Sequence, residues 1–589
     1  MSINTQKITD LLKQIYSINQ VDEIANTITE VMDRYCRQQA IQQTGPIKSF
    51  PITEQDSLLI TYGDQFVQEG KTPLAVLHAF LQEYMQGLIS GVHILPFFPY
   101  SSDDGFAVID YEQVDPAKGS WADIADIRHD FNLMFDLVVN HISAQSIWFK
   151  KFQAGKKPYD EYFITLDTND DLSAVIRPRT TPLLTPKETA DGLKYVWTTF
   201  GIDQIDLNYQ NPLVLLEMVK VLLFYVSRGA NFIRLDAIAF LWKVPGSSCL
   251  HLPQTHAIVK LFRAILDEVA PQVLLITETN VPHEENISYF GALENNSQRT
   301  DEAQLVYQFP LAPLVLHSFI NHNTIALSTW AAALPKLQPG TAFFNFIASH
   351  DGIGLRPIEN LLSPSEIQTL VQQTLAHGGR VSYKINSDGI QTAYELNITW
   401  FDALNHPVEE PTEVSIARFL ASQAIMLCMA GVPGIYIHSL FGSRNCYQCV
   451  QETGRERSIN REKFRYQTIK AELENQNNLK AKVFNGYSHL LHVRRQQKAF
   501  NPMAEQDILQ ICSSVFCVLR TALDGERILC LVNVTDQICH LEIDSKQIGE
   551  SMSDEWTDLL SKDVYPASEI LQVSLHPFQS RWLLASRRL

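Results

Sequence analysis

The sequence predicts an α/β fold, a closed (β/α)8 TIM barrel with inserted lid subdomains and a small C-terminal all-β domain. Eight short apolar runs rich in β-branched and aromatic residues recur along the chain, and most of them precede a longer helix-like segment. Continuous rather than alternating hydrophobicity indicates strands that are covered on both faces, as in parallel sheets. Eight such units favour a closed barrel, and an open doubly wound sheet is the alternative.

The positions of the polar residues agree with a barrel. Helix-like segments such as residues 215–230 separate the apolar runs. His141, Asp236, Glu278 and Asp351 stand at the carboxyl ends of four runs, and the loops at that edge of a barrel build its active site. The eight predicted strands are residues 57–63, 91–99, 132–141, 231–238, 273–279, 304–309, 342–351 and 431–439.

Three regions lie outside this repeat. Residues 7–43 have the apolar spacing of helices, which predicts a helical extension packed on the main body. Long polar spans follow the third and seventh strands, and loops of that length are usually functional lids or small domains. From about residue 500, short alternating strands are separated by polar turns. We therefore divide the chain into an N-terminal helical extension (1–50), three parts of a catalytic barrel (51–141, 206–351 and 413–498), an inserted domain B (142–205), an inserted lid (352–412) and a C-terminal β domain (499–589).

Composition limits the class of partner. The 589 residues include 47 Lys and Arg against 65 Asp and Glu, a net charge of −18, which disfavours nucleic acid and anionic membrane surfaces. No stretch approaches the roughly 20 apolar residues of a membrane span. Nine irregularly spaced cysteines fit a reducing compartment, and Cys446 and Cys449 are interpreted as loop cysteines rather than zinc ligands. We expect a cytoplasmic monomer or homodimer that acts on small molecules, without nucleic acid, membrane, metal or cofactor.

The segment FIRLDAI (232–238) places Arg234 and Asp236 two residues apart, on one face of a strand. The guanidinium is expected to hold the carboxylate ionised with a lowered pKa, and an ionised carboxylate can act as a nucleophile. The alternative is a buried ion pair that only fixes the core.

Glu278 ends the next predicted strand. Because neighbouring strands lie about 4.8 Å apart, the carboxyl groups of Asp236 and Glu278 are expected about 5 to 5.5 Å apart, the separation typical of a retaining glycosidase. The charges of Asp236 and Asp351 should raise the pKa of Glu278 and make it a general acid. Pairing of Glu278 with a barrel cation is the alternative.

The segment SHDGIG (349–354) supplies two further candidates. Asp351 is expected to bind sugar hydroxyls and to stabilise positive charge on the anomeric carbon, and His350 to donate to a hydroxyl. The alternative is a simple turn with an Asx cap.

Taken in order, four segments resemble the signature regions of glycoside hydrolase family 13, the α-amylase superfamily. The resemblance implies Asp236 as nucleophile, Glu278 as acid/base and Asp351 as transition-state stabiliser, with Arg234, His141 and His350 around the glucosyl ring. Asn140 stands where calcium-binding relatives have a ligand, which is weak support for a metal. The four segments are DLVVNH (136–141), FIRLDAI (232–238), ITET (276–279) and SHDGIG (349–354).

Within that superfamily, GVHILPFFPYSSDDGFAVIDY (91–111) is similar to the sucrose phosphorylase group. The resemblance implies that Asp103 and Arg461 clamp the far hydroxyls of a single glucose, with Phe106 as an apolar platform. A closed pocket of this kind disfavours cleavage inside polysaccharides.

The segment AVIRPRTTPLLTP (174–186) holds Arg177 and Arg179 on either side of a proline. Two guanidinium groups on a stiffened loop suit phosphate oxygens, and a solvated basic turn is the alternative. The resemblance implies that Arg179 binds phosphate together with the lid residue Tyr394. Glu395 stands where the sucrose phosphorylase group usually has Gln.

The sequence leaves several alternatives for the acceptor, the molecule that is released when the glucosyl group is transferred. The extension and segments such as ITETNVPH (276–283) look closer to the glucosylglycerate phosphorylases. That implies cleavage of an α-glucoside by inorganic phosphate to α-glucose 1-phosphate and the free acceptor, most simply glucosylglycerate. Alternatives are a sucrose, sucrose 6'-phosphate or glucosylglycerol phosphorylase, a hydrolase or transglucosidase, and a sugar-binding protein on a decayed barrel. A second anion site is plausible at His256, His283, Lys243 and Arg444, on or near the mouth loops, and the alternative is that each is a surface or internally satisfied residue.

Overall fold

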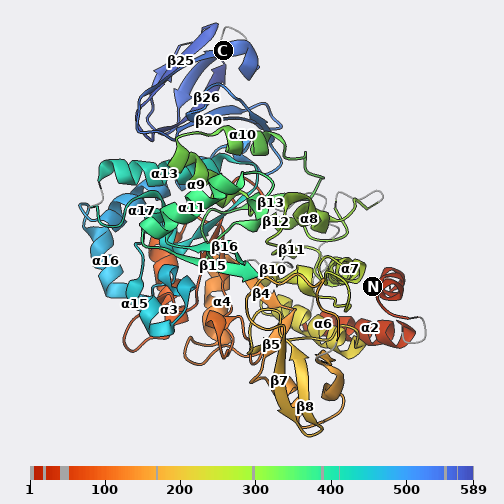
Figure 1. Cartoon of the computed structure of the whole chain (residues 1–589). Coiled ribbons are helices and arrows are strands. Elements are labelled where there is room, and N and C mark those ends of the chain that lie inside the picture. Colours follow the sequence, from red (N-terminus) through yellow and green to blue (C-terminus); the bar gives the residue numbers. More distant parts are fainter. Residues whose placement is uncertain are drawn as a thin grey trace.

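The closed parallel barrel is confirmed in the computed structural model (Figure 1), with strand order β1-β17-β13-β12-β11-β10-β4-β3. Each neighbouring pair is parallel, so the open-sheet alternative is wrong. The structure describes residues 5–17, 21–39, 52–167, 170–294, 299–385, 391–409, 412–549, 554–566 and 568–587. The barrel strands are β1 (Leu58–Thr61), β3 (Gly91–Ile94), β4 (Asn132–Val138), β10 (Ala230–Asp236), β11 (Leu274–Thr277), β12 (Leu305–Tyr307), β13 (Ala342–Asn345) and β17 (Val432–Tyr436).

Helices surround the barrel, and their starts follow local sequence rules. α6 follows Asn211, whose side chain accepts a hydrogen bond from the Leu213 amide, and Pro212 is its first residue. α4 is preceded by Ser120, which forms a capping box with Asp123. The surrounding helices include α3 (Pro73–Phe80), α4 (Trp121–Asp130), α6 (Pro212–Ser227), α7 (Pro253–Val269), α9 (Leu311–Asn321), α13 (Glu413–Cys428), α16 (Tyr466–Glu474) and α17 (Leu479–Arg494).

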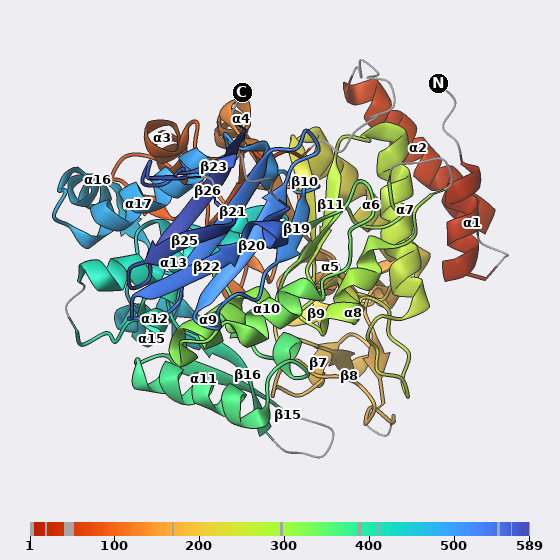
Figure 2. The ribbon, with the colours of Figure 1, turned by 90° about the horizontal axis from the view of Figure 1, so that it is seen from above.

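The N-terminal segment forms two helices, α1 (Gln6–Ile15) and α2 (Val21–Gln39), as its apolar spacing predicts. They lie outside α7 and α6, forming a second layer of helices on one side of the barrel (Figure 2). Tyr16 Oη donates to the carbonyl of Tyr209 at 2.9 Å and so ties this layer to the barrel body. The buried face of α1 consists of Ile8, Leu11, Leu12 and Ile15.

Two insertions lie between barrel strands. The first, after β4, contains one antiparallel pair, β5-β9, and a three-stranded sheet of order β6-β8-β7. The second, after β13, is built on the three-stranded sheet β14-β16-β15. Their elements are β5 (His141–Ser143), α5 (Ile147–Gln153), β6 (Thr165–Leu166), β7 (Leu184–Thr189), β8 (Gly192–Trp197), β9 (Gln204–Asp206), β14 (Ile353–Gly354), α11 (Pro364–Ala376), β15 (Arg380–Ile385), β16 (Gln391–Asn397) and α12 (Trp400–Leu404).

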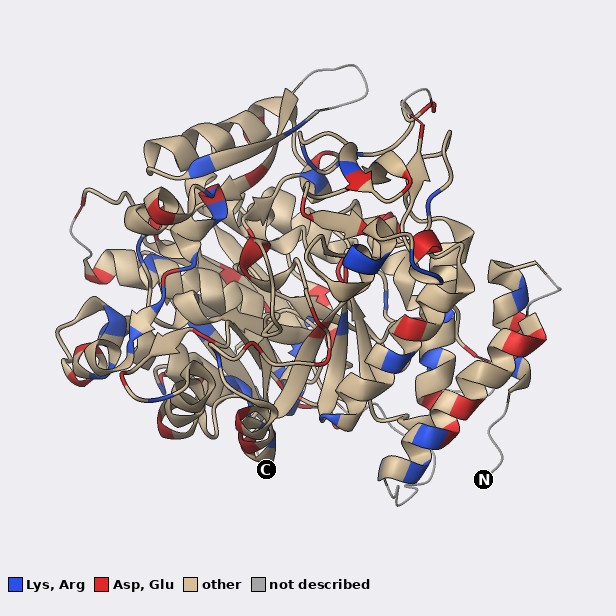
Figure 3. Ribbon diagram, turned by 90° about the horizontal axis from the view of Figure 1, so that it is seen from below, with Lys and Arg blue, Asp and Glu red and all other residues tan. Residues whose placement is uncertain are grey.

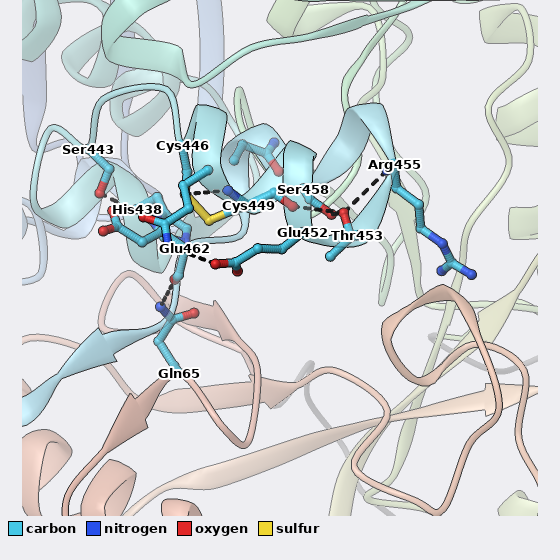
Figure 4. The surroundings of a disulfide bond; sticks show 12 residues. Gln65, His438, Ser443, Cys446, Cys449, Glu452, Thr453, Arg455, Ser458 and Glu462 are labelled. Atoms are coloured by element: carbon cyan, nitrogen blue, oxygen red, sulfur yellow. Dashed lines mark hydrogen bonds between the residues drawn. A yellow bond between two sulfur atoms is a disulfide. The ribbon is translucent and has the colours of Figure 1, made fainter.

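Between β17 and α16, the chain forms α15 (Tyr447–Thr453) and the 3-10 helix η8 (Glu456–Asn460). Here the interpretation of Cys446 and Cys449 as unpaired loop cysteines is wrong, because they form a disulfide at the start of α15 (Figure 4). Their Cα atoms are 5.3 Å apart, within the range that a disulfide can bridge. Cys446 also donates its amide to the carbonyl of Ile459, so the bridge lies directly beside η8.

The C-terminal region is all-β, as predicted, and lies at the top of Figure 1. A six-stranded sheet of order β19-β20-β21-β26-β23-β24 lies with the pair β22-β25. The sequence analysis did not predict β19, β23 or β24. These strands are β19 (Glu505–Ile508), β20 (Val515–Thr521), β21 (Arg527–Asn533), β22 (Cys539–Asp544), β23 (Asp554–Asp558), β24 (Val564–Tyr565), β25 (Ile570–Leu575) and β26 (Ser580–Arg587).

Charged residues of both signs are interspersed over the helices, as the face in Figure 3 shows. This distribution accompanies the net charge of −18. Within the described ranges, every helix is too short or too polar to span a bilayer.

Candidate active site

A pocket opens at the carboxyl ends of the barrel strands and is covered by side chains from both insertions. Ten of the predicted site residues line it, whereas Arg177, Arg234 and Arg461 are not among its lining residues. The ten are Asp103, Phe106, His141, Arg179, Asp236, Glu278, His350, Asp351, Tyr394 and Glu395.

Arg234 and Asp236 project from the end of β10 on the same face, as their spacing predicts. Arg234 Nη1 donates to Asp236 Oδ1 at 2.8 Å and also to Asp136 Oδ1 on the neighbouring β4. Asp136 is bound in turn by His93 at 2.6 Å. Arg234 is thus a buried support that orients Asp236 from below the pocket.

The expectation of a lowered pKa for Asp236 is wrong. Burial, followed by the charges of Asp136 and Asp351, raises the pKa of Asp236 to about 6, although Arg234 acts in the opposite direction. The local ion pair is outweighed because the guanidinium is shared between two carboxylates and the site is desolvated. Asp236 is still mainly ionised at neutral pH.

Glu278 follows β11 immediately and meets Asp236 across the sheet. Its Oε2 accepts a hydrogen bond from the Ala237 amide at 3.1 Å, and its Oε1 lies 3.9 Å from Arg234 Nη2. Ala237 adopts a left-handed conformation with φ of 49°, which turns the chain away after the strand. Burial, together with the charge of Asp236, raises the pKa of Glu278 to about 7, so the predicted direction is correct.

Asp351 lies beside the guanidinium of Arg457 and the ring of His350. Arg457 Nη1 lies 2.5 Å from its Oδ1, and His350 Nε2 lies 3.6 Å from its Oδ2. Burial alone would raise the pKa of Asp351, but the charges around it, with Arg457 first and Arg461 and Arg234 also contributing, together outweigh burial and hold the pKa well below its usual range. Asp351 is therefore a permanent anion facing the pocket.

Arg457, on η8, is a pocket residue that the sequence analysis missed. Its Nη2 and Nε donate to Glu395 Oε2 at 3.0 and 3.1 Å, and Glu395 Oε1 accepts from the Gly352 amide at 2.6 Å. Glu395 therefore secures Arg457 beside Asp351 rather than presenting a free carboxylate. The sequence did contain a sign of this residue, because three arginines, Arg455, Arg457 and Arg461, lie in one short segment. The sequence analysis assigned only Arg461 to the site.

Asp103 and Phe106, the residues predicted to bind glucose, line one pocket. Phe106 stacks on the ring of His350, with centroids 4.9 Å apart and planes 5° from parallel. Arg461 Nη1 binds Asp104 Oδ2 at 2.5 Å and its Nε donates to the His350 carbonyl. The clamp of Asp103 and Arg461 on the hydroxyls of a glucose stays a prediction. Burial would raise the pKa of Asp103, but nearby arginines, with Arg457 first, lower it.

His141 is buried beside Phe106. Its Nε2 lies 3.0 Å from the Phe106 carbonyl and 3.2 Å from Gln204 Nε2. Burial lowers the pKa of His141, so it is a neutral hydrogen-bonding group at pH 7.

The two arginines of the inserted loop have different surroundings. Arg179 lines the pocket, with its Cζ atom 5.6 Å from the Tyr394 ring centroid and 5.9 Å from that of Phe200. Arg177 binds the carbonyl of Thr181 in its own loop. The predicted fork of two guanidinium groups is therefore wrong, because only one arginine of this loop, Arg179, lines the pocket.

Comparison with known proteins gives the family. A family model described as the α-amylase catalytic domain matches residues 81–353. The chain is 50% identical over 487 residues to the glucosylglycerate phosphorylase of Spirochaeta thermophila, covering 82% of this chain and 81% of that protein. The chain belongs to the phosphorylases of the α-amylase family. It is also 45% identical to the glucosylglycerate phosphorylase of Escherichia coli K12, covering 90% and 92% of the two chains.

Other phosphorylases of the family are more distant. The sucrose 6(F)-phosphate phosphorylase of Thermoanaerobacterium thermosaccharolyticum is 29% identical over 75% of this chain and 88% of that protein. The crystal structure of sucrose 6F-phosphate phosphorylase from this source superimposes with a TM-score of 0.70 at 26% identity, covering 82% of this chain and 94% of that one. Isomaltulose synthase from Klebsiella shares the fold, with a TM-score of 0.65 at 17% identity over 90% and 99% of the two chains.

The expected second anion site is wrong, because the structure gives its members other surroundings and none lines the pocket. His256 binds Glu302, and Arg444 binds Asp402. His283 packs against Phe343. Lys243 is buried in a separate polar cluster.

The polar cluster around Lys243 contains Asn140, the residue that stands where calcium-binding relatives have a ligand. Lys243 Nζ donates to Asn140 Oδ1 at 2.8 Å and pairs with Asp206 Oδ2 at 2.8 Å. An ammonium group thus supplies the positive charge beside Asn140. Within the described residues, no group of three or more His, Cys, Asp or Glu side chains is arranged to hold a metal ion.

Proposed function

We propose that the protein cleaves glucosylglycerate with inorganic phosphate, giving α-glucose 1-phosphate and glycerate by a double displacement with retention. The observation that carries the substrate assignment is the identity to glucosylglycerate phosphorylases, which far exceeds the identity to the sucrose-type relatives. The pocket carboxylates Asp236, Glu278 and Asp351, together with Arg179, support the double displacement.

In the first displacement, a carboxylate oxygen of Asp236 attacks the anomeric carbon. The bond from that carbon to the glycerate oxygen breaks, and its electron pair stays on the oxygen, which takes the proton of Glu278. A pKa of about 6 for Asp236 and about 7 for Glu278 favours one ionised and one protonated group near neutral pH. Asp236 and Glu278 both lie within 4 Å of the Arg234 guanidinium, which supports their action on one carbon.

In the second displacement, a phosphate oxygen attacks the same carbon from the face that glycerate has left. The bond to Asp236 breaks, its electron pair returns to the carboxylate, and two inversions give net retention. The proton of the attacking hydrogen phosphate passes to Glu278, which restores its acid form for the next turnover. Arg179 is the proposed phosphate ligand, beside Tyr394. Asp351 stabilises the positive charge that develops on the anomeric carbon in both steps.

The test runs the reaction in reverse. The protein is supplied with α-glucose 1-phosphate and, separately, glycerate, glycerol, fructose or water, and phosphate release is followed. We expect fastest release with glycerate and loss of release with Asp236→Asn. Equal release with water would favour the hydrolase alternative, and preference for fructose would favour the sucrose alternative.

A further inference from the structure

The lining of the pocket has more carboxylates than cations. Of the lining residues that the structure describes, five carry a carboxyl group and two carry a guanidinium, Arg179 and Arg457. Such a pocket repels an anion unless a cation remains free to bind it. The five acidic residues are Asp103, Asp236, Glu278, Asp351 and Glu395.

Arg457 is already neutralised. Its three guanidinium nitrogens bind Asp351 and Glu395. The side chain of Glu395 is 3% exposed, and those of Arg457 and Asp351 are 20% and 22% exposed. The pKa of Arg457 is raised far above its usual range because the attraction of Asp351 and Glu395 exceeds the opposing effect of burial. A ligand anion would have to displace one of these carboxylates.

The histidines in the pocket do not provide a positive charge. Burial lowers the pKa of His350 to about 3 and that of His438 to about 3. Burial also lowers the pKa of His141. All three are neutral at pH 7 and can only donate or accept hydrogen bonds.

Arg179 is the remaining cation. Its Nη1 donates to the Pro178 carbonyl at 3.2 Å, and within the described chain it has no ion pair with a carboxylate. The rings of Tyr394 and Phe200 hold its guanidinium at the pocket. The other nitrogens of the fork can bind a carboxylate or a phosphate in the same bidentate geometry.

The proposed function requires two anions to occupy this pocket in turn, glycerate and phosphate. We propose that Arg179 forms a single anion subsite for both, which binds the glycerate carboxylate before the first displacement and phosphate before the second. This inference rests on the proposed function. It requires the two anions to exclude each other, so phosphate enters only after glycerate has left.

The first test uses the wild-type protein without a glucosyl donor, so that no chemistry occurs. Phosphate is titrated by calorimetry in the absence and presence of glycerate at about ten times the dissociation constant of glycerate. A shared subsite raises the apparent dissociation constant for phosphate about tenfold by mass action. An unchanged constant overturns the proposal, whatever the turnover assay gives.

The second test compares Arg179→Gln with the matched control Arg177→Gln, whose guanidinium lies in the same loop but outside the pocket. We expect Arg179→Gln to raise KM for phosphate and KM for glycerate at least tenfold each, and KM for the neutral acceptor glycerol no more than about twofold. Arg177→Gln should match the wild type in all three. A KM for glycerate that stays at the wild-type value while that for phosphate rises would show separate subsites and overturn the proposal.

The two hypotheses fail differently. A wild-type protein that uses glycerol but not glycerate refutes the proposed substrate through the turnover assay. Thermal unfolding of both arginine variants separates loss of binding from loss of fold.

Discussion

Arg457 and Asp351 form an ion pair in the pocket, Nη1 to Oδ1 at 2.5 Å, and the other nitrogens of the same guanidinium bind Glu395. Glu395 lies on β16 of the second insertion, and Asp351 follows barrel strand β13. One arginine therefore couples the position of the inserted sheet to the charge state of a carboxylate that lines the pocket.

Arg457→Met should strongly destabilise the protein, because it removes the guanidinium that pairs with both Asp351 and Glu395. We expect the free energy of unfolding to fall by about 3 to 5 kcal/mol and kcat to be severely reduced. Urea unfolding and turnover measure the two effects. Arg455→Met, in which the removed guanidinium is partly exposed and 3.8 Å from Asp103, should cost less than about 1 kcal/mol. Equal stability of the two variants would contradict the role given to Arg457.

A plot of kcat/KM against pH should be bell-shaped and narrow, because the two pKa values that limit it are close together. The rate falls toward acid as Asp236, with a pKa of about 6, gains a proton, and falls toward alkali as Glu278, with a pKa of about 7, loses one. Because the two groups interact, the limits belong to the pair. The measurement is kcat/KM with a neutral glucosyl donor and a neutral acceptor, so that only the protein titrates. A flat profile from about pH 5 to 8 would exclude this acid and base pair.

Glu278→Gln should stabilise the folded protein at alkaline pH. The folded pKa of Glu278, about 7, lies above its ordinary value of 4.5, so its protonated form favours folding at low pH and this contribution is lost as pH rises through 7. At about pH 8, we expect the variant to be more stable by about 1 to 3 kcal/mol, with the difference disappearing near pH 4. Denaturant unfolding at both pH values measures it, with the exposed Glu284→Gln as control. A constant difference across pH would contradict the buried ionisation.

Reduction of the Cys446 to Cys449 disulfide should have a modest effect on stability. The bridge closes a loop of only a few residues, so its removal is expected to cost no more than about 2 kcal/mol. Thermal unfolding with and without dithiothreitol measures the loss, and hydrogen exchange should increase first in α15. The double variant Cys446→Ser with Cys449→Ser should not respond to the reductant. A wild-type protein that is equally insensitive would refute a stabilising bridge.

The barrel and the three pocket carboxylates could be predicted because each depends on patterns between residues that are close in the sequence. Period-two alternation in β10 fixes Arg234 and Asp236 on one face, and Glu278 follows the next strand directly. The raised pKa of Asp236 could not be predicted, because it depends on burial and on Asp136 from another strand.

The sequence also could not predict which arginines line the pocket. Arg177 and Arg179 flank the same proline, and only the path of the loop decides which one reaches the pocket. Arg457 lies on a 3-10 helix whose orientation depends on contacts with Glu395 and Asp351, far away in the sequence. Such choices depend on tertiary structure rather than on local pattern.

The outer pair of N-terminal helices limits how this chain can associate with itself. By lying over α6 and α7, α1 and α2 occupy a flank of the barrel that would otherwise be open to a neighbour. A homodimer has to use a different face of the barrel, or else be built on α1 and α2 themselves.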